Sequence, residues 1–179
     1  MEQKQRFLHL ACIEPTPYAE IATRLNVEPK QLSRWWEELL PERQVIAALK
    51  RRHASKKDIG MSFAEFYAWF QQQPPCCHYC GITEAEIEEL LRAGNIKTKR
   101  ITTRGKRLEL DRKMPEPSYA VVENLVLCCY WCNNAKTDEF SADEFRLIAP
   151  AFRTVWQSRL LKVRSRSRQA PLCVDGPVC

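Results

Sequence analysis

The sequence contains no long apolar run and no leader-like start. No window approaches the roughly 20 apolar residues of a membrane-spanning helix, so we expect no transmembrane segment. The opening residues, MEQKQRFLHL, lack a charged stretch followed by an apolar one, which argues against secretion. At 179 residues the chain is too short for a large multidomain enzyme. These absences predict a cytoplasmic protein with one good core, or with a small helical domain and a metal-stapled one.

Cysteine, by contrast, is abundant, with nine in the chain. In a cytosolic protein, paired cysteines indicate metal or redox chemistry more often than structural disulfides. Two Cys-x-x-Cys half-sites each present two sulfurs to one metal, and four thiolates form the closed tetrahedral site of structural zinc. A redox dithiol is the weaker alternative, and the neighbouring Cys76 and Cys128 leave the register open. The predicted zinc ligands are Cys77, Cys80, Cys129 and Cys132.

The segment between the two half-sites is far longer than the roughly 15–20 residues of a compact zinc finger. Something is therefore folded between them, with zinc clamping its ends. The stretch KRITTRGKRLELDR predicts a β-hairpin that turns at Arg104 and Gly105 and ends its second strand at Asp111. Further along, YAVVENLVLCC predicts a short buried strand.

Three helices are predicted from capping boxes, in which a Ser or Thr stands three residues before a Glu. The first is rich in aromatic residues, which we expect to lie in a core. The second should end before Gly94, and the third should be interrupted by Pro150 and resume as far as about Lys162. The three pairs are Ser62 with Glu65, Thr83 with Glu86, and Ser141 with Glu144.

Near the start, TPYAEIATRLNVEPKQLSRWWEELL predicts two helices joined by one short turn. Asn26 tolerates a left-handed conformation at the turn, and Pro29 favours the first position of the second helix. The pattern resembles a helix-turn-helix with residues 29–38 as the recognition helix, although a plain helical hairpin has the same spacing. The residues offered to a DNA groove would be Lys30, Gln31, Ser33 and Arg34.

The basic residues are clustered, and the formal net charge is +6. Such clusters suit a polyanion, so we expect nucleic acid as a partner, with Arg104 and Lys106 among the contacts. Solvated helix faces and a basic tail are the alternative explanation for any one cluster. The clusters lie at residues 50–57, 97–107 and 162–168.

The stretch LELDRKMPEPSYAVVENLVLCCYWCNNAKTD, with CHYCG upstream, resembles the HNH endonuclease family. The shared features are an acidic residue at a strand end, an Asn before the second knuckle, and then Cys-Asn-x-x-Lys. The resemblance covers roughly residues 60–140 and implies a ββα-metal fold with a zinc half-site on each side. The expected fold class is therefore α+β and mostly helical, with the helix-turn-helix-like module first.

The resemblance also implies roles for individual residues. Asp111 and Asn133 would hold a catalytic divalent cation, Mg²⁺ or Mn²⁺, which prefers oxygen ligands and would stabilise the leaving oxygen during phosphodiester hydrolysis. Asn124 would orient the loop or the base, and Lys136 would contact phosphate. A turn-capping carboxylate and a helix cap are the alternative roles of Asp111 and Asn133.

One position departs from the family, because Arg112 stands where the general-base histidine belongs. Arginine cannot act as a base, since its pKa is above about 12, but it suits a bidentate grip on phosphate. The base could come from elsewhere, a metal-bound water could attack unaided, or the fold could have lost cleavage. The histidines are His9, His53 and His78, and we expect His78 to face solvent or to lie beside the site.

The leading prediction is a zinc-stabilised HNH-type endonuclease that cuts DNA. The alternatives are a catalytically inactive zinc and helix-turn-helix protein that binds nucleic acid or serves as a partner subunit, and a zinc-stapled protein-interaction module. The resemblance implies a phage, mobile-element or anti-phage defence context, with a protein partner and oligomerisation left open. The predicted domains are a helical module at 1–58, the nuclease domain at 59–163, and a basic tail without fixed structure at 164–179.

Overall fold

In the computed structural model the chain forms two compact units. Unit 1 comprises residues 1–73 and 118–122, and unit 2 comprises residues 74–117 and 123–179. The sequence-based boundary between residues 58 and 59 therefore falls inside unit 1. The structure describes residues 2–56, 58–97, 104–116 and 119–169.

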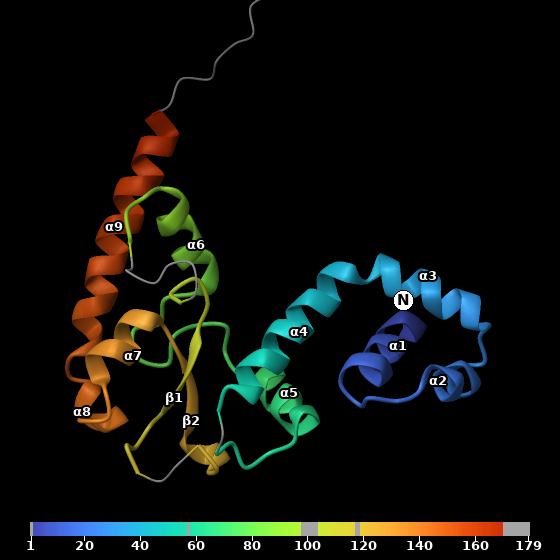
Figure 1. Cartoon of the computed structure of the whole chain (residues 1–179). Coiled ribbons are helices and arrows are strands. Elements are labelled where there is room, and N and C mark those ends of the chain that lie inside the picture. Colours follow the sequence, from blue (N-terminus) through green and yellow to red (C-terminus); the bar gives the residue numbers. More distant parts are fainter. Residues whose placement is uncertain (1, 57, 98–103, 117–118, 170–179) are drawn as a thin grey trace, which may run out of the picture. The chain divides into compact units, whose positions relative to one another are not determined.

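The secondary-structure elements of unit 1 are helices, among its described residues (Figure 1). Its core is apolar and aromatic, and Phe7, Ile21 and Leu32 are fully buried in it. The ring of Phe7 lies 5.9 Å from those of Tyr18 and Trp35, so aromatic contacts join three helices. The helices are α1 (Glu2–Cys12), α2 (Tyr18–Leu25), α3 (Pro29–Glu38), α4 (Leu40–Ala54) and α5 (Phe63–Gln72).

The turn between α2 and α3 has the local geometry predicted from the sequence. Asn26 adopts the left-handed conformation, with φ 51° and ψ 53°, and Pro29 begins α3. Helix α3 packs against α1 and α2 and exposes Lys30 and Arg34, while Gln31 is half-buried. The role of this element in reading DNA stays a prediction.

The segment 118–122 returns to unit 1 from the connection between the two strands of unit 2. The Lys56 ammonium donates to the Tyr119 hydroxyl over 3.0 Å and lies 4.1 Å from the ring centroid. Gly60 packs directly on Ala120, because a Cβ at Gly60 would lie 2.6 Å from the Ala120 carbonyl oxygen. This close backbone approach is open only to glycine.

Unit 2 contains a two-stranded antiparallel sheet among its described residues, as the α+β prediction required. Leu110 pairs with Leu127, and Asp111 pairs with Val126. The predicted first strand of the 99–112 hairpin falls mostly on residues 99–103, outside the described residues, and Gly105 has the positive φ of a turn, 90°. The elements are α6 (Glu84–Arg92), β1 (Glu109–Arg112), η1 (Val122–Asn124), β2 (Leu125–Cys128), α7 (Tyr130–Lys136), α8 (Ala142–Phe145) and α9 (Ala149–Gln169).

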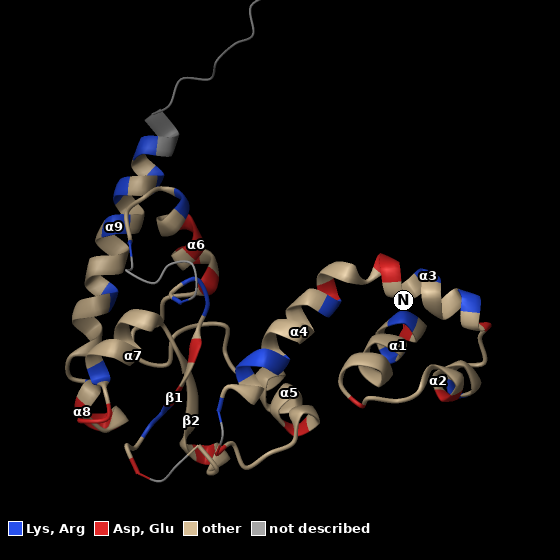
Figure 2. Cartoon of the chain, in the orientation of Figure 1, with Lys and Arg blue, Asp and Glu red and all other residues tan. Residues whose placement is uncertain are grey.

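Helix α9 extends beyond its predicted end at Lys162, so the first part of the expected tail is helical. The extension has a partner, because Arg164 forms an ion pair of 2.8 Å with Glu89 of α6. Figure 2 shows the acidic positions of α6 and the basic positions of α9 that make such pairing available. Pro150 is the second residue of α9, where its missing N–H costs nothing, so it begins this helix instead of interrupting one.

All three predicted capping boxes are formed, and they begin α5, α6 and α8. In each, the hydroxyl of the Ser or Thr accepts from the backbone N–H three residues on, and the Glu carboxylate accepts in return from the backbone N–H of the capping residue. Within the described part of the chain, no helix has both the length and the apolar character needed to cross a bilayer.

Candidate functional site

The four cysteines predicted as zinc ligands lie together and are buried. Their sulfur atoms are all within 4.8 Å of one another, and Cys80 Sγ is 3.8 Å from Cys129 Sγ. A tetrahedral zinc ion with bonds of about 2.3 Å needs its sulfurs about 3.8 Å apart. Both the donor set and the spacing therefore fit a structural zinc ion. Cys76 and Cys128 lie outside this cluster, so the pairs that could hold the ion are Cys77 with Cys80 and Cys129 with Cys132.

Backbone hydrogen bonds shape the first half-site into a knuckle. The Cys77 N–H donates to the Ile82 carbonyl over 2.8 Å, and Gly81 closes the turn with φ 70°. The His78 N–H donates to the Leu127 carbonyl over 2.8 Å, which ties the knuckle to β2. Hydrogen bonds from Cys129 and then from Cys132 lower the pKa of the Cys77 thiol, which favours the thiolate form that binds metal.

The second half-site also begins a helix. The Cys129 sulfur accepts a hydrogen bond from the Cys132 N–H over 3.4 Å and thereby caps α7. Helix α7 packs against β1 and carries Asn133 and Lys136. The same sulfur therefore serves the metal cluster and sets the start of the helix that bears the predicted site residues.

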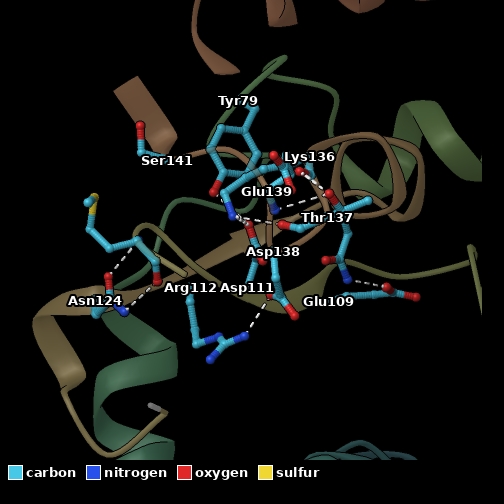
Figure 3. Close-up of polar contacts among 12 residues, drawn as sticks. Tyr79, Glu109, Asp111, Arg112, Asn124, Lys136, Thr137, Asp138, Glu139 and Ser141 are labelled. Atoms are coloured by element: carbon cyan, nitrogen blue, oxygen red, sulfur yellow. Dashed lines mark hydrogen bonds and ion pairs between the residues drawn. The ribbon is translucent and has the colours of Figure 1, made fainter. Parts of the chain in front are cut away.

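Asp111 is the centre of the polar cluster at the end of β1 (Figure 3). Its side chain is buried, and its Oδ2 accepts a hydrogen bond of 2.6 Å from the Tyr79 hydroxyl. The Lys136 ammonium lies 3.5 Å from the same oxygen. Burial and the bond to Asp111 raise the pKa of Tyr79, so its hydroxyl stays a donor. Among the described contacts, Oδ1 of Asp111 has no partner.

Glu109 belongs to the polar cluster, although it was not predicted from the sequence. It stands two positions before Asp111, so the two carboxylates lie on one face of β1. The Asn133 amide nitrogen donates to Glu109 over 2.8 Å, while Asn133 and Asp111 make no direct contact among the described interactions. Arg104 pairs with Glu109 through Nε over 2.9 Å, and its contact with nucleic acid stays a prediction. Lys106, the other predicted contact of this segment, is exposed.

Arg112 and Asn124 make hydrogen bonds near Asp111 that hold neighbouring segments of the chain. The Arg112 guanidinium donates to Asp138 over 2.6 Å, and the arginine side chain is largely buried while Asp138 is exposed. Asn124 accepts from the Met114 N–H over 2.8 Å and donates to the Met114 carbonyl over 3.0 Å. The Asn124 amide therefore holds the loop that follows β1, and its part in any reaction stays a prediction.

Lys136, which was predicted to contact phosphate, is buried beside Asp111. Its side chain is 0% exposed, and its ammonium donates to the Thr137 carbonyl over 3.3 Å. The ammonium faces Asp111, and a contact of Lys136 with phosphate stays a prediction. The burial of a lysine could not be read from the sequence, because no local pattern distinguishes it from a solvated one.

His78 lies on the first knuckle with its ring exposed and edge-on to Tyr79. Partial burial and the charges of Arg146 and Lys113 lower the pKa of His78, so the imidazole is neutral at pH 7. The two other histidines belong to unit 1, where His9 pairs with Glu14 and the His53 ring contacts the Met61 carbonyl.

The chain matches no family model and no curated protein. Among solved structures it is similar to one of PacI, described as a rare-cutting HNH restriction endonuclease, with 29% identity and a TM-score of 0.45. The similarity covers 55% of this chain and 66% of PacI, so the chain spans just under two thirds of that structure. A likeness at this TM-score does not establish a family.

Proposed function

We propose that the chain is a zinc-stabilised, divalent-metal-dependent endonuclease of the HNH type that hydrolyses phosphodiester bonds in DNA. The observation that supports this most is the coupling of the cysteine cluster to the polar cluster. Cys129 caps α7, and α7 brings Asn133 and Lys136 against the strand that carries Asp111. A zinc ion in the cysteine cluster would therefore fix the positions of the reacting groups without taking part in the reaction.

The donor atoms of the polar cluster suit Mg²⁺ or Mn²⁺. Asp111 uses Oδ2 internally and keeps Oδ1, and Asn133 uses its amide nitrogen on Glu109 and keeps its carbonyl oxygen. A carboxylate and an amide oxygen are the hard ligands that these ions prefer, with water and a substrate phosphate as further ligands. Asp111 and Asn133 would hold the ion, whose chemistry there is to stabilise negative charge on the phosphate and the leaving oxygen.

The surrounding residues then have distinct tasks. Arg112 cannot act as a base, but its planar guanidinium suits a bidentate contact with the scissile phosphate, which would replace Asp138 as its partner. Tyr79 holds the Asp111 carboxylate, and Glu109 orients the Asn133 amide. Asn124 keeps the loop after β1 in place.

The test is cleavage of supercoiled plasmid and of single-stranded DNA by zinc-loaded protein, with Mg²⁺, Mn²⁺ or no added divalent ion. We expect metal-dependent nicking that is lost in Asp111→Asn and in Asn133→Ala, while both variants keep their zinc and their thermal unfolding transition. Exposed Asn134, next to Asn133 on α7, provides the matched control, and Asn134→Ala should cut like the wild type. Activity retained in Asp111→Asn would show that the site has been misplaced.

A second candidate is a DNA-binding protein that has kept this fold without cleavage. Arg112 at the position of the base favours it, and so does the pairing of Asp111, Glu109 and Asp138 with internal cations. Tight DNA binding by a folded, zinc-loaded protein that cuts nothing with either ion would favour this candidate.

We also propose that α3 contributes affinity for DNA through Lys30, Gln31 and Arg34, with Lys106 adding a phosphate contact in unit 2. The side chains of Lys30, Arg34 and Lys106 are exposed, and none of the three has a partner among the described contacts. Each cation that meets a phosphate should add about 0.9 to the slope of log affinity against log salt. Lys30→Ala and Arg34→Ala should therefore flatten that slope, and an unchanged slope in both would remove α3 from the interface.

A further inference from the structure

Lys136 is the one fully buried lysine among the described residues, and the proposed function leaves it without a task. Asp111, whose Oδ2 lies 3.5 Å from the Lys136 ammonium, is also buried. A buried charge is costly unless an opposite charge and hydrogen bonds compensate it. The pair therefore has to be considered as one unit, in which neither charge is stable alone.

The ammonium is held in place from its own side by the backbone. It donates to the Thr137 carbonyl over 3.3 Å. Thr137 has φ 54° and ψ −159°, which is rare and strained for a β-branched residue. Two hydrogen bonds stabilise this conformation, since the Thr137 hydroxyl donates to the Lys136 carbonyl and accepts from the Glu139 N–H. These hydrogen bonds hold Thr137, whose backbone carbonyl accepts from the Lys136 ammonium, in place at the end of α7.

The contacts on Asp111 are asymmetric. The Tyr79 hydroxyl at 2.6 Å and the Lys136 ammonium at 3.5 Å both approach Oδ2, and no described residue contacts Oδ1 (Figure 3). A carboxylate fixed by one oxygen has a defined orientation of the other. We propose that Lys136 is a positioning residue, which holds Asp111 through Oδ2 so that Oδ1 is presented to the divalent ion. This inference rests on the proposed nuclease function and deepens it.

A purely structural lysine would predict a different result from a positioning one. Loss of packing should weaken metal binding and cleavage together. Loss of a positioning cation removes electrostatic repulsion between the ammonium and the incoming ion, so metal binding should become tighter. At the same time Asp111 is released from its fixed orientation, and catalysis should become slower. Effects of opposite sign therefore distinguish a lysine that acts through its charge from one that only fills space.

The experiment compares wild type with Lys136→Met, which removes the charge and keeps an unbranched side chain of similar length. Binding of Mn²⁺ to zinc-loaded protein is measured by electron paramagnetic resonance, and plasmid nicking is measured at saturating Mn²⁺. We expect the Kd for Mn²⁺ to fall at least about tenfold and the cleavage rate to fall about 10- to 100-fold. Exposed Lys162 of α9 gives the matched control for Mn²⁺ binding, because Lys162→Met removes the same charge outside the metal site.

Two further variants keep the test decisive. Lys136→Gln retains an N–H donor for the Thr137 carbonyl and replaces Lys136→Met if the latter does not fold, with zinc content as the criterion. Tyr79→Phe removes a neutral donor from Oδ2, so it should leave the Kd for Mn²⁺ within about threefold of wild type. Mn²⁺ affinity that is unchanged or weaker in the Lys136 variants would overturn the inference alone. A wild type that binds no Mn²⁺, or binds it equally well after Asp111→Asn, would overturn the proposed metal site and this inference together.

Discussion

The two units are stabilised by different chemistry. Unit 1 buries an apolar cluster built around Phe7, Ile21 and Leu32. Unit 2 also has apolar residues in its interior, but it contains the four-cysteine cluster and the buried polar side chains Asp111, Asn124 and Lys136. Buried charges are costly for folding unless they are paired, so their concentration in unit 2, beside a cluster of metal-binding thiols, marks it as the place where function has shaped the sequence.

The largest expected effect is the loss of the metal cluster. Cys80→Ser removes one of four thiolates, and structural zinc typically contributes about 10–16 kcal/mol to folding, so unit 2 should lose well over about 5 kcal/mol. Metal content by mass spectrometry and far-ultraviolet circular dichroism should show lost zinc and partly retained helix, because unit 1 contains none of the four cysteines. Cys12→Ser in unit 1 is the control, and full zinc content in Cys80→Ser would contradict the four-thiolate assignment.

The next effect belongs to unit 1. Phe7 is fully buried and contacts Tyr18, Trp35 and Trp36, so Phe7→Ala should cost about 3–5 kcal/mol through lost contacts and a cavity. Denaturant unfolding followed by tryptophan fluorescence would measure this loss, with zinc content unchanged. Tyr18→Phe keeps the ring that Phe7 contacts and should cost much less. Release of zinc by folded Phe7→Ala would contradict this comparison, because it would show that the cysteine cluster of unit 2 depends on the apolar core of unit 1.

A smaller effect is expected where segment 118–122 meets unit 1. Gly60→Ala would place a Cβ 2.6 Å from the Ala120 carbonyl oxygen, and the backbone shift that relieves this contact should cost about 1–3 kcal/mol. Thermal unfolding and the rate of limited proteolysis in the β1–β2 connection would report the change. Glu116→Ala, an exposed substitution in the same connection, should change neither. Equal stability of Gly60→Ala and wild type would mean that this contact is not closely packed.

The smallest effect concerns the α6–α9 ion pairs of unit 2. Partial burial opposes ionisation of Glu86, but hydrogen bonds from Arg153 and the Thr83 N–H outweigh it and lower the pKa of the carboxyl. A lowered folded-state pKa stabilises the fold above the unfolded value of about 4.3, and this contribution disappears as the pH falls through the folded value.

Glu86→Gln should therefore lower stability by about 0.5–1 kcal/mol at pH 7, with the difference from wild type vanishing at strongly acidic pH. Unfolding free energies measured from pH 7 down to pH 3 would follow this convergence. The control is Glu88→Gln, because the Glu88–Arg92 pair is much more exposed. A difference that grows toward acid pH would have the wrong sign for this explanation.

Local signals in the sequence were enough for much of the fold. The capping boxes, the left-handed Asn26, the first-position Pro29 and strand β2 were all predicted correctly, because each depends on residues within one turn or one strand. The zinc ligands could be predicted because a two-residue spacer by itself brings two sulfurs together. Helix α9 was predicted too short, because its last turns depend on Glu89, far away in the sequence.

The polar cluster was predicted only in part, for a related reason. Asp111 and Asn133 could be chosen from the order of motifs along the chain. The burial of Lys136 and the bond between Asn133 and Glu109 depend on how α7 packs against β1, and no spacing within either segment encodes that packing. The alternation of Glu109 with Asp111 on one strand was the available signal for the second carboxylate.

The return of segment 118–122 into unit 1 has a consequence for dissecting the protein. The chain passes between the two units at three places, after residues 73, 117 and 122. A fragment of residues 1–73 would lack Tyr119 and Ala120, which Lys56 and Gly60 contact, and a fragment of residues 74–179 would carry those two residues without their partners. Neither half is a contiguous gene fragment, so a truncation that fails to express would report a missing piece of chain and not a missing activity.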